Sequence, residues 1–558
     1  MKYAMRPVAF QSDNHFDITV LGALDMSHEE QDRDDKNALD RRRFLTGATA
    51  LGAAVGAFAA APASAEVRFP TEPGRFGSGG AVGRPGSTFS GQVNRSENTL
   101  YDCEVDGDIP DDLDGAFYRV GPDAQYPKPK GLEYDIAFDG EGHASMFRIK
   151  NSHVDYLSRW VKNERWQAQH KARKSLYGVY RNPYTDDPSV RGKFRGTQNT
   201  QVWYHNGRIL AMKEDTLPAA LDPHTLETLD GNYKFDGKLK SQTFTAHPKN
   251  DSHTGNLLAF GYEATGLGST DISVFEIDKR GKTIWQAMVK APYCSEIHDY
   301  AITEKHIVFL VYPLAYLGEE LMKKGGVHWG WDSTRDTYLG VMRRGGDGKD
   351  IQWLKGPQTM CTHTMGCWTD GEMVYVDMDG GDGNQFPFFP SPNANDKFDP
   401  VKATGRVRRF SMDASKKTVR PFDMKVMYGE YSGGLARQDD RYHTVPYRYG
   451  FMIGGGPGGG GWLRVDHQTG KVNTFNPGPD SSLSEMCFVP RRKGAPEGDG
   501  YLVGVCSRAK EYGRSDLLIV DAQHMEDGAV ATIKLPYRAA PQVHGFWVPG
   551  DQLPPAKA

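Results

Sequence analysis

The chain has 558 residues, of which 25% are charged, with a formal net charge of −4 and a pI near 6.5. This balance lacks the basic excess of a nucleic-acid-binding protein, so we expect no nucleic-acid partner. Beyond the N-terminal segment no run of about 18 apolar residues occurs, so no transmembrane span is predicted.

Residues 1–65 have the features of an export leader. Asp40-Arg-Arg-Arg-Phe-Leu45 resembles a twin-arginine signal, and an apolar stretch rich in Ala and Gly follows over residues 47–61. Ala63-Ser-Ala65 then supplies small residues before a cleavage point ahead of Glu66. We therefore expect export by the twin-arginine route to the periplasm. The alternative is a short hydrophobic helix at a disordered end.

The stretch before the arginines is polar and acidic, unlike a compact signal, so either Met1 or Met26 could be the start. Residues 66–95 contain Gly-Ser-Gly-Gly and Arg-Pro-Gly-Ser and predict a flexible entry segment. We assign residues 96–552 to one folded domain and residues 553–558 to a tail.

Short strand patterns fill this domain, and the 64 glycines and 33 prolines of the chain suit many tight turns. Residues Gln201–Met212 predict a hairpin around Asn206-Gly207. Three further strand pairs are predicted at 271–278 with 283–285, 461–465 with 472–475, and 516–521 with 531–535. So many strands with few long helical patterns favour an all-β fold closed on itself, such as a β-propeller. No internal repeat is visible, so the residues alone do not give the number of blades.

Two stretches, Val161–Tyr177 and Tyr316–Lys324, predict helices. Inserted between strands, they would form a cap over one end of the fold. The aromatic loop Gln385–Pro392 is another cap candidate, as either a pocket wall or a surface loop pinned by prolines. The glycine run 454–461 lacks the Gly-Lys-Ser/Thr ending of a phosphate loop and predicts a turn between strands.

The six cysteines form no Cys-x-x-Cys pair. An even number in an exported protein permits disulfides. However, Cys361 and Cys367 flank His363, and Cys487 follows Glu485 by two residues. This placement favours buried free thiols near the core.

Four histidines stand in separate strand-like contexts far apart in the chain: His247, His298, His363 and His544. No local zinc motif has such spacing, whereas a propeller gathers distant strands at one axis. Imidazole binds iron, copper and zinc, and a ligand set without negative charge favours a divalent ion. Taken one at a time, each histidine is more often structural than metal-binding, so the flanking sequence decides.

That flanking sequence resembles the carotenoid cleavage oxygenase family over residues 95–550. The matching blocks, in the family's order, are 115–122, 138–143, 246–255, 298–303, 439–442 with 447–450, 488–491, and 544–545. The resemblance implies a seven-bladed β-propeller with a helical and loop cap over the iron site. It also implies one non-haem Fe(II) per subunit, held by the four histidines, and cleavage of conjugated alkenes with O2 to carbonyl products.

Within the family, Phe138, Tyr180 and Lys213 resemble the substrate residues of the branch that cleaves lignostilbenes. In that branch a tyrosine and a lysine contact the substrate phenol, and a phenylalanine packs on a ring. The implied reaction is cleavage of the central C=C bond of 4-hydroxystilbenes with O2 to two aromatic aldehydes, with Tyr180 and Lys213 as catalytic residues.

Three alternatives stay open. The same iron site could act on an apocarotenoid, or on a phenylpropene such as isoeugenol. A non-enzymatic propeller that binds a ligand would instead survive chelation unchanged and take up no oxygen. The sequence also leaves open whether the protein is a homodimer.

The family places carboxylates behind the iron histidines, where they accept the other ring N–H and fix the tautomer. Glu214 and Glu485 match two of these positions. At the third, the run Gly434-Leu-Ala-Arg437 has glycine in place of glutamate, and Glu430 is a candidate only through a loop shift. The identity of the third carboxylate is therefore open.

Overall fold

The computed structural model describes residues 96–127, 136, 139–393, 396–415, 421–457, 459–511, 513–540 and 542–556. The expected leader, the entry segment and Phe138 lie outside these residues. All described residues belong to one compact unit. Within these ranges, no helix has both the length and the apolar character needed to cross a bilayer.

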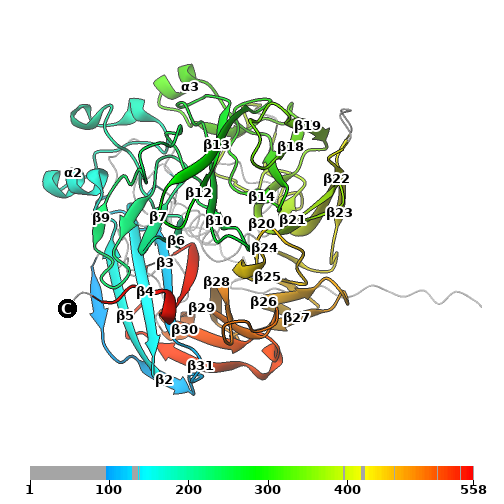
Figure 1. Ribbon diagram of the computed structural model, residues 1–558. Coiled ribbons are helices and arrows are strands. Elements are labelled where there is room, and N and C mark those ends of the chain that lie inside the picture. Colours follow the sequence, from blue (N-terminus) through cyan, green and yellow to red (C-terminus); the bar gives the residue numbers. More distant parts are fainter. Residues whose placement is uncertain are drawn as a thin grey trace, which may run out of the picture. The chain divides into compact units, whose positions relative to one another are not determined.

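Seven antiparallel sheets surround a central axis, which makes the fold a seven-bladed β-propeller (Figure 1). From the axis outward, the first blade consists of β32 (His544–Pro549), β3 (Gly115–Pro122), β4 (Gly142–Lys150), β5 (His153–Trp160) and β1 (Asn98–Leu100). The second blade consists of β6 (Gln201–His205), β7 (Arg208–Met212), β8 (Ala219–Leu221) and β9 (Thr228–Asp230). The third blade consists of β10 (Lys249–Asn250), β11 (Leu257–Tyr262), β12 (Asp271–Ile277) and β13 (Thr283–Lys290).

The remaining blades follow in chain order. They are β14 (Tyr300–Ile302), β15 (His306–Val311), β18 (Thr337–Arg343) and β19 (Gln352–Gly356); β20 (Met360–Asp370), β21 (Met373–Gly381), β22 (Arg406–Asp413) and β23 (Asp423–Val426); β24 (Ser432–Gln438), β25 (Tyr449–Gly456), β26 (Gly459–Asp466) and β27 (Val472–Phe475); and β28 (Ser481–Pro490), β29 (Gly500–Arg508), β30 (Arg514–Asp521), β31 (Ala529–Lys534) and β2 (Glu104–Gly107). A separate hairpin, β16 (Leu314–Tyr316) and β17 (Trp329–Trp331), extends from the fourth blade.

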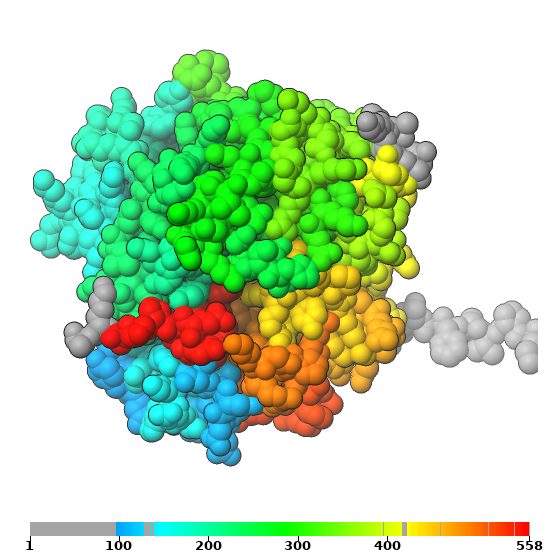
Figure 2. Space-filling view, viewed as in Figure 1, coloured from blue at the N-terminus to red at the C-terminus, as the bar shows by residue number. Residues whose placement is uncertain are grey.

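Strands from both ends of the chain close the ring. β32 completes the first blade by pairing with β3, from Gly115 opposite Pro549 to Val120 opposite His544. At the other end, β2 joins the last blade by pairing with β31. Figure 2 shows the red C-terminal residues against the blue and cyan N-terminal blade. Ring closure lets the first and last blades pack together, as Phe117 and Val503 do in one hydrophobic cluster, and brings His544 to the axis.

The predicted hairpins are confirmed. β6 pairs with β7 around Asn206 and Gly207, whose φ angles of 50° and 71° are those of a two-residue turn that matches strand twist. The pairs β12–β13, β26–β27 and β30–β31 also form as predicted. The glycine run extends beyond a turn, because Gly454, Gly455 and Gly456 pair with Gly461, Gly460 and Gly459 across β25 and β26.

Both predicted helices are shorter than expected. α2 spans Glu164–Ala172, because the Asn163 side chain caps its first turn and Arg173 adopts a left-handed conformation that ends it. α3 spans only Glu319–Lys323, because Tyr316 is the last residue of β16 and Gly325 follows with a φ of 87°. In the part of the chain that the structure describes, the other helical elements are six 3-10 turns: Pro183–Thr185, Pro188–Val190, Asp440–Tyr442, Ala509–Glu511, Met525–Asp527 and Gly550–Gln552. The helical cap over the iron site stays a prediction.

The hydrophobic core lies between neighbouring blades. One cluster joins Tyr118 of the first blade to Leu210 of the second, and another joins Trp462 of the sixth to Leu502 of the seventh. All six cysteines are free thiols, and all but the half-buried Cys294 are buried, so the expectation of free thiols is confirmed.

Candidate metal centre

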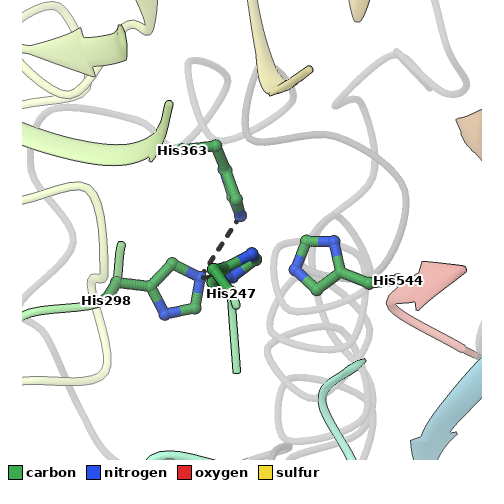
Figure 3. Close-up of side chains that lie close together, drawn as sticks. All are labelled: His247, His298, His363 and His544. Atoms are coloured by element: carbon green, nitrogen blue, oxygen red, sulfur yellow. Dashed lines mark hydrogen bonds between the residues drawn. The ribbon is translucent and has the colours of Figure 1, made fainter. Parts of the chain in front are cut away.

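The structure brings together the four histidines singled out in the sequence. They come from four blades: His247 precedes β10, His298 precedes β14, His363 lies in β20, and His544 begins β32. In Figure 3 the four rings point toward a common centre. One nitrogen from each ring lies within 4.8 Å of the others, and the Nε2 atom of His298 lies 3.0 Å from that of His247 and 3.2 Å from that of His363.

A β-bulge sets the direction of His363. The register of β20 against β21 shifts between Cys361 and Thr364 and again between Thr364 and Gly366. Such a bulge adds a residue on one strand and re-aims its side chain. Here it lets a residue in the middle of an 11-residue strand point its ring at the propeller axis.

The two carboxylates expected from the resemblance lie behind two of the histidines. His298 donates from Nδ1 to Glu214 at 2.6 Å, and His544 donates from Nδ1 to Glu485 at 2.9 Å. Glu485 also accepts the backbone N–H of Gly545 at 3.0 Å and pairs with Arg437 at 3.2 Å. Each carboxylate therefore leaves the Nε2 lone pair of its histidine facing the centre.

Two further carboxylates at the centre were not predicted from the sequence. Asp379 on β21 accepts from His363 Nδ1 at 3.1 Å, and Glu296 lies 3.5 Å from His298 Nδ1. The candidate Glu430 is exposed, so it does not fill this role. A cross-strand contact of this kind has no local sequence signal, although the position of Glu296 two residues before His298 was one available hint.

Tyr180 and Lys213, the predicted substrate residues, lie side by side. Both are buried, and Lys213 Nζ lies 4.7 Å from the centre of the Tyr180 ring. Lys213 donates to the side-chain oxygen of Asn199 at 3.2 Å, and Asn199 in turn donates to the backbone oxygen of Gly140 at 2.7 Å. Phe389, from the aromatic loop, packs with its ring 6.5 Å from Tyr180.

Comparison with known proteins decides the family. Residues 91–549 match the family described as retinal pigment epithelial membrane protein. The chain is 40% identical to lignostilbene-alpha,beta-dioxygenase isozyme III of Sphingomonas paucimobilis and 40% identical to isoeugenol monooxygenase of Pseudomonas nitroreducens, each over 82% of this chain and 96% of the relative. The chain belongs to the carotenoid cleavage oxygenase family. It is an alkene-cleaving oxygenase of that family.

A solved structure agrees with the fold of the oxygenase. The crystal structure of Pseudomonas brassicacearum lignostilbene dioxygenase superposes with a TM-score of 0.78 at 37% identity, over 82% of this chain and 96% of that one. The oxygenase therefore shares both the propeller and its connectivity with a member of the family.

The four histidines of the oxygenase fit the family's iron. The buried Nε2 of His544 has no hydrogen-bond partner among the described residues, as expected of a ligand atom. Two nitrogens bound to one metal at about 2.1 Å and roughly a right angle are about 3.0 Å apart, which matches the separations at His298. Burial lowers the pKa of His247 and of His544, so both rings are neutral at pH 7 and offer lone pairs.

The surrounding charges also favour a divalent cation. Burial alone would raise the pKa of Glu214 and of Glu485, but their histidine partners lower each to about 2. Burial alone would lower the pKa of His298, but its hydrogen bonds to Glu214 and Glu296 raise it to about 10. In the metal-free protein His298 is therefore protonated at pH 7, and a divalent cation bound at its Nε2 atom would replace that proton as the positive charge facing Glu214.

Proposed function

We propose that this oxygenase uses Fe(II) to cleave the central C=C bond of 4-hydroxystilbenes, of the lignostilbene or resveratrol kind, into two aromatic aldehydes. The observation that carries the proposal is the buried pair of Lys213 and Tyr180. This pair lies close to the metal centre in the sequence, because Lys213 directly precedes Glu214, which accepts the hydrogen bond of His298. The relative named lignostilbene dioxygenase supports the same substrate class.

The substrate phenol would give this pair a further partner. Burial lowers the pKa of Lys213, because an ammonium group is poorly solvated there. A phenolate oxygen beside it would add a negative charge, and Tyr180 would offer a hydroxyl donor to the same oxygen. A phenolate held in this way pushes electron density through the ring onto the alkene carbons, in a site where exclusion of water strengthens such interactions.

Bound Fe(II) would supply the redox chemistry that makes O2 reactive. The overall reaction balances without an added reductant, because the C=C bond breaks and each of its carbons takes one oxygen atom of O2. The protein's share is to place the alkene beside the four-histidine centre and to keep the phenol charged or hydrogen-bonded.

A phenylpropene is the second candidate substrate. Isoeugenol carries the same para-hydroxyl group, so Lys213 and Tyr180 could serve it in the same way. The isoeugenol monooxygenase relative is as similar in sequence as the lignostilbene enzyme. An apocarotenoid has no phenol and would offer this polar pair neither a charge nor a hydrogen bond.

The test is to load the protein with Fe(II) and supply 4-hydroxystilbene, 4-methoxystilbene, isoeugenol and an apocarotenal under air, with aldehyde products identified by chromatography. We expect 4-hydroxystilbene to be preferred over its methoxy analogue by up to about 10⁴-fold in kcat/KM, because the methoxy group cannot ionise or donate a proton. Equal rates on these two compounds would contradict phenol activation. Faster turnover of isoeugenol than of any stilbene would select the second candidate.

A further inference from the structure

Asp379 is the least expected residue of the metal centre. It lies on β21, is fully buried, and stands across from the bulge of β20 that carries His363. No carboxylate is expected on this strand from the family resemblance, which instead points to the position of Gly434 on β24.

The side chain of Asp379 has two distinct sets of partners. Its Oδ1 atom accepts from the hydroxyl of Thr362 at 2.7 Å and from the backbone N–H groups of Thr362 and His363 at 3.3 and 3.0 Å. Its Oδ2 atom accepts from His363 Nδ1 at 3.1 Å and from the backbone N–H of Ala436 at 3.0 Å. Oδ1 therefore accepts the hydrogen bonds of the bulge residues, and Oδ2 accepts the hydrogen bond of the His363 ring.

We propose that Asp379 has taken over, from the neighbouring blade, the role of the missing carboxylate at Gly434. It is a positioning residue: it holds the proton of His363 on Nδ1, so that the Nε2 lone pair faces the metal. The inference rests on the proposed iron centre and names the residue that sets its third ligand.

The contact with Ala436 explains how the role could move between strands. Ala436 lies two residues after Gly434 on β24, and it donates a backbone N–H to the same oxygen that His363 uses. The family resemblance leads us to expect a carboxylate on β24 itself. Instead, β24 donates a backbone N–H to a carboxylate that belongs to β21. The shorter aspartate suffices because β20 and β21 are hydrogen-bonded neighbours.

The substitution Asp379→Asn distinguishes the role of Oδ1 in the bulge from the role of Oδ2 at His363. The amide oxygen can still accept the hydrogen bonds of the bulge, whereas the amide NH2 in place of Oδ2 can only donate. His363 Nδ1 would then have to accept, which moves the ring proton to Nε2 and removes the lone pair from the metal. A loss of metal affinity without loss of fold is the signature of this change.

The matched control is Asp377→Asn. Asp377 lies two residues earlier on β21, on the same face of the strand, and is also fully buried. It pairs with Arg409 at 2.7 Å and accepts from Tyr447 at 2.7 Å, and these partners are not ligand histidines. This variant therefore reports the general cost of removing a buried charge from the strand.

The experiment measures Fe(II) affinity by competition with a chelator, the visible spectrum of the Co(II)-loaded protein, and the melting temperature of the metal-free protein. We expect Asp379→Asn to bind Fe(II) about 10- to 100-fold more weakly and to have an altered Co(II) spectrum. Asp377→Asn should melt lower yet keep the affinity and the spectrum. Unchanged affinity and spectrum in a folded Asp379→Asn protein would overturn the proposal.

A second variant decides the matter if Asp379→Asn does not fold. Adding Gly434→Glu supplies a carboxylate from β24, and we expect the double variant to recover both fold and Fe(II) binding. No recovery in the double variant would overturn the proposal. Failure of the iron centre itself would be visible earlier, as an unmodified protein that binds no Fe(II).

Discussion

At the scale of single residues, the proposed function assigns the choice of substrate to Lys213 and Tyr180. A buried ammonium beside a tyrosine ring is poorly solvated and is stabilised by an anionic partner. In the proposed function the phenol of the substrate adds such a partner. Selectivity and metal binding should therefore depend on different residues, although Lys213 and Glu214 are adjacent in the sequence.

We predict that Lys213→Met removes most of the preference for 4-hydroxystilbene over 4-methoxystilbene, because the side chain keeps its length but loses its charge. Iron content should not change, since Lys213 is neither one of the four histidines nor one of the carboxylates that accept from them. The measurement is the ratio of kcat/KM for the two compounds, with metal analysis of the same samples. Lys234→Met, at an exposed position, is the control and should retain the ratio. A retained preference in Lys213→Met would remove this residue from phenol recognition.

At the scale of elements, one buried ion pair joins three of the blades that carry the histidines. Lys249 lies two residues after His247 and pairs with Asp299, directly after His298, at 2.8 Å. The other oxygen of Asp299 accepts the backbone N–H of Thr364, directly after His363, at 2.7 Å. Residues next to three of the histidines are therefore tied together by the hydrogen bonds of Asp299.

We predict that Lys249→Met lowers the free energy of unfolding by about 3–5 kcal/mol, because it leaves Asp299 buried without its counter-charge. The double variant Lys249→Met with Asp299→Asn should lose less than the sum of the two single variants, as measured by urea unfolding. Lys290→Met is the control: Lys290 pairs with Asp271 but is 76% exposed, so we expect a change of less than about 1 kcal/mol. Strictly additive losses would mean that the buried pair is not coupled.

A second buried cluster anchors the turn that carries Tyr180. Glu263 pairs with Arg181, the residue after Tyr180, and accepts from His328 Nε2 at 2.9 Å. Burial alone would raise the pKa of Glu263, but His328 and Arg181 lower it to about 2. An unfolded glutamate has a pKa of about 4.3. The stability that ionised Glu263 contributes is therefore complete above that value and is lost as the pH falls toward 2.

Because the pKa of Glu263 is lower in the folded than in the unfolded protein, we predict a loss of stability in acid that the Glu263→Gln variant lacks. Between about pH 5 and pH 3 the unmodified protein should lose roughly 2 kcal/mol more of its free energy of unfolding than the variant does. Urea unfolding at a series of pH values would measure the difference. Parallel curves for the two proteins would show that Glu263 is not held ionised by its partners.

At the scale of the whole molecule, both ends of the folded domain take part in ring closure, through β2 and β32. The segment that precedes β1 carries the twin-arginine pattern and lies outside the described residues. A twin-arginine route would carry the propeller already closed, with its metal bound, which would protect the site from binding a wrong metal.

We therefore propose export to the periplasm and predict a mature N-terminus near Glu66. N-terminal sequencing of active protein from fractionated cells would measure it. A variant in which Arg41, Arg42 and Arg43 are changed to lysine should accumulate with its leader intact. Finding active protein only in the cytoplasm with an uncut leader would contradict the export proposal.

The sequence by itself was sufficient for several features that have a local or motif-based signal. The hairpin at Asn206-Gly207 follows from two residues that tolerate positive φ, and Glu214 and Glu485 follow from their family motifs. The four histidines were found in the same way, since each has its own flanking block.

The tertiary structure decided the features that depend on contacts between strands distant in sequence. Asp379 lies beside His363 only because β21 pairs with β20 across a bulge, and the pairing of Lys249 with Asp299 requires neighbouring blades. The helix ends also changed, because capping by Asn163 and the pairing of Tyr316 in β16 override a helical pattern. A residue pattern specifies which elements form, but the register and closure of the propeller decide which side chains meet at its axis.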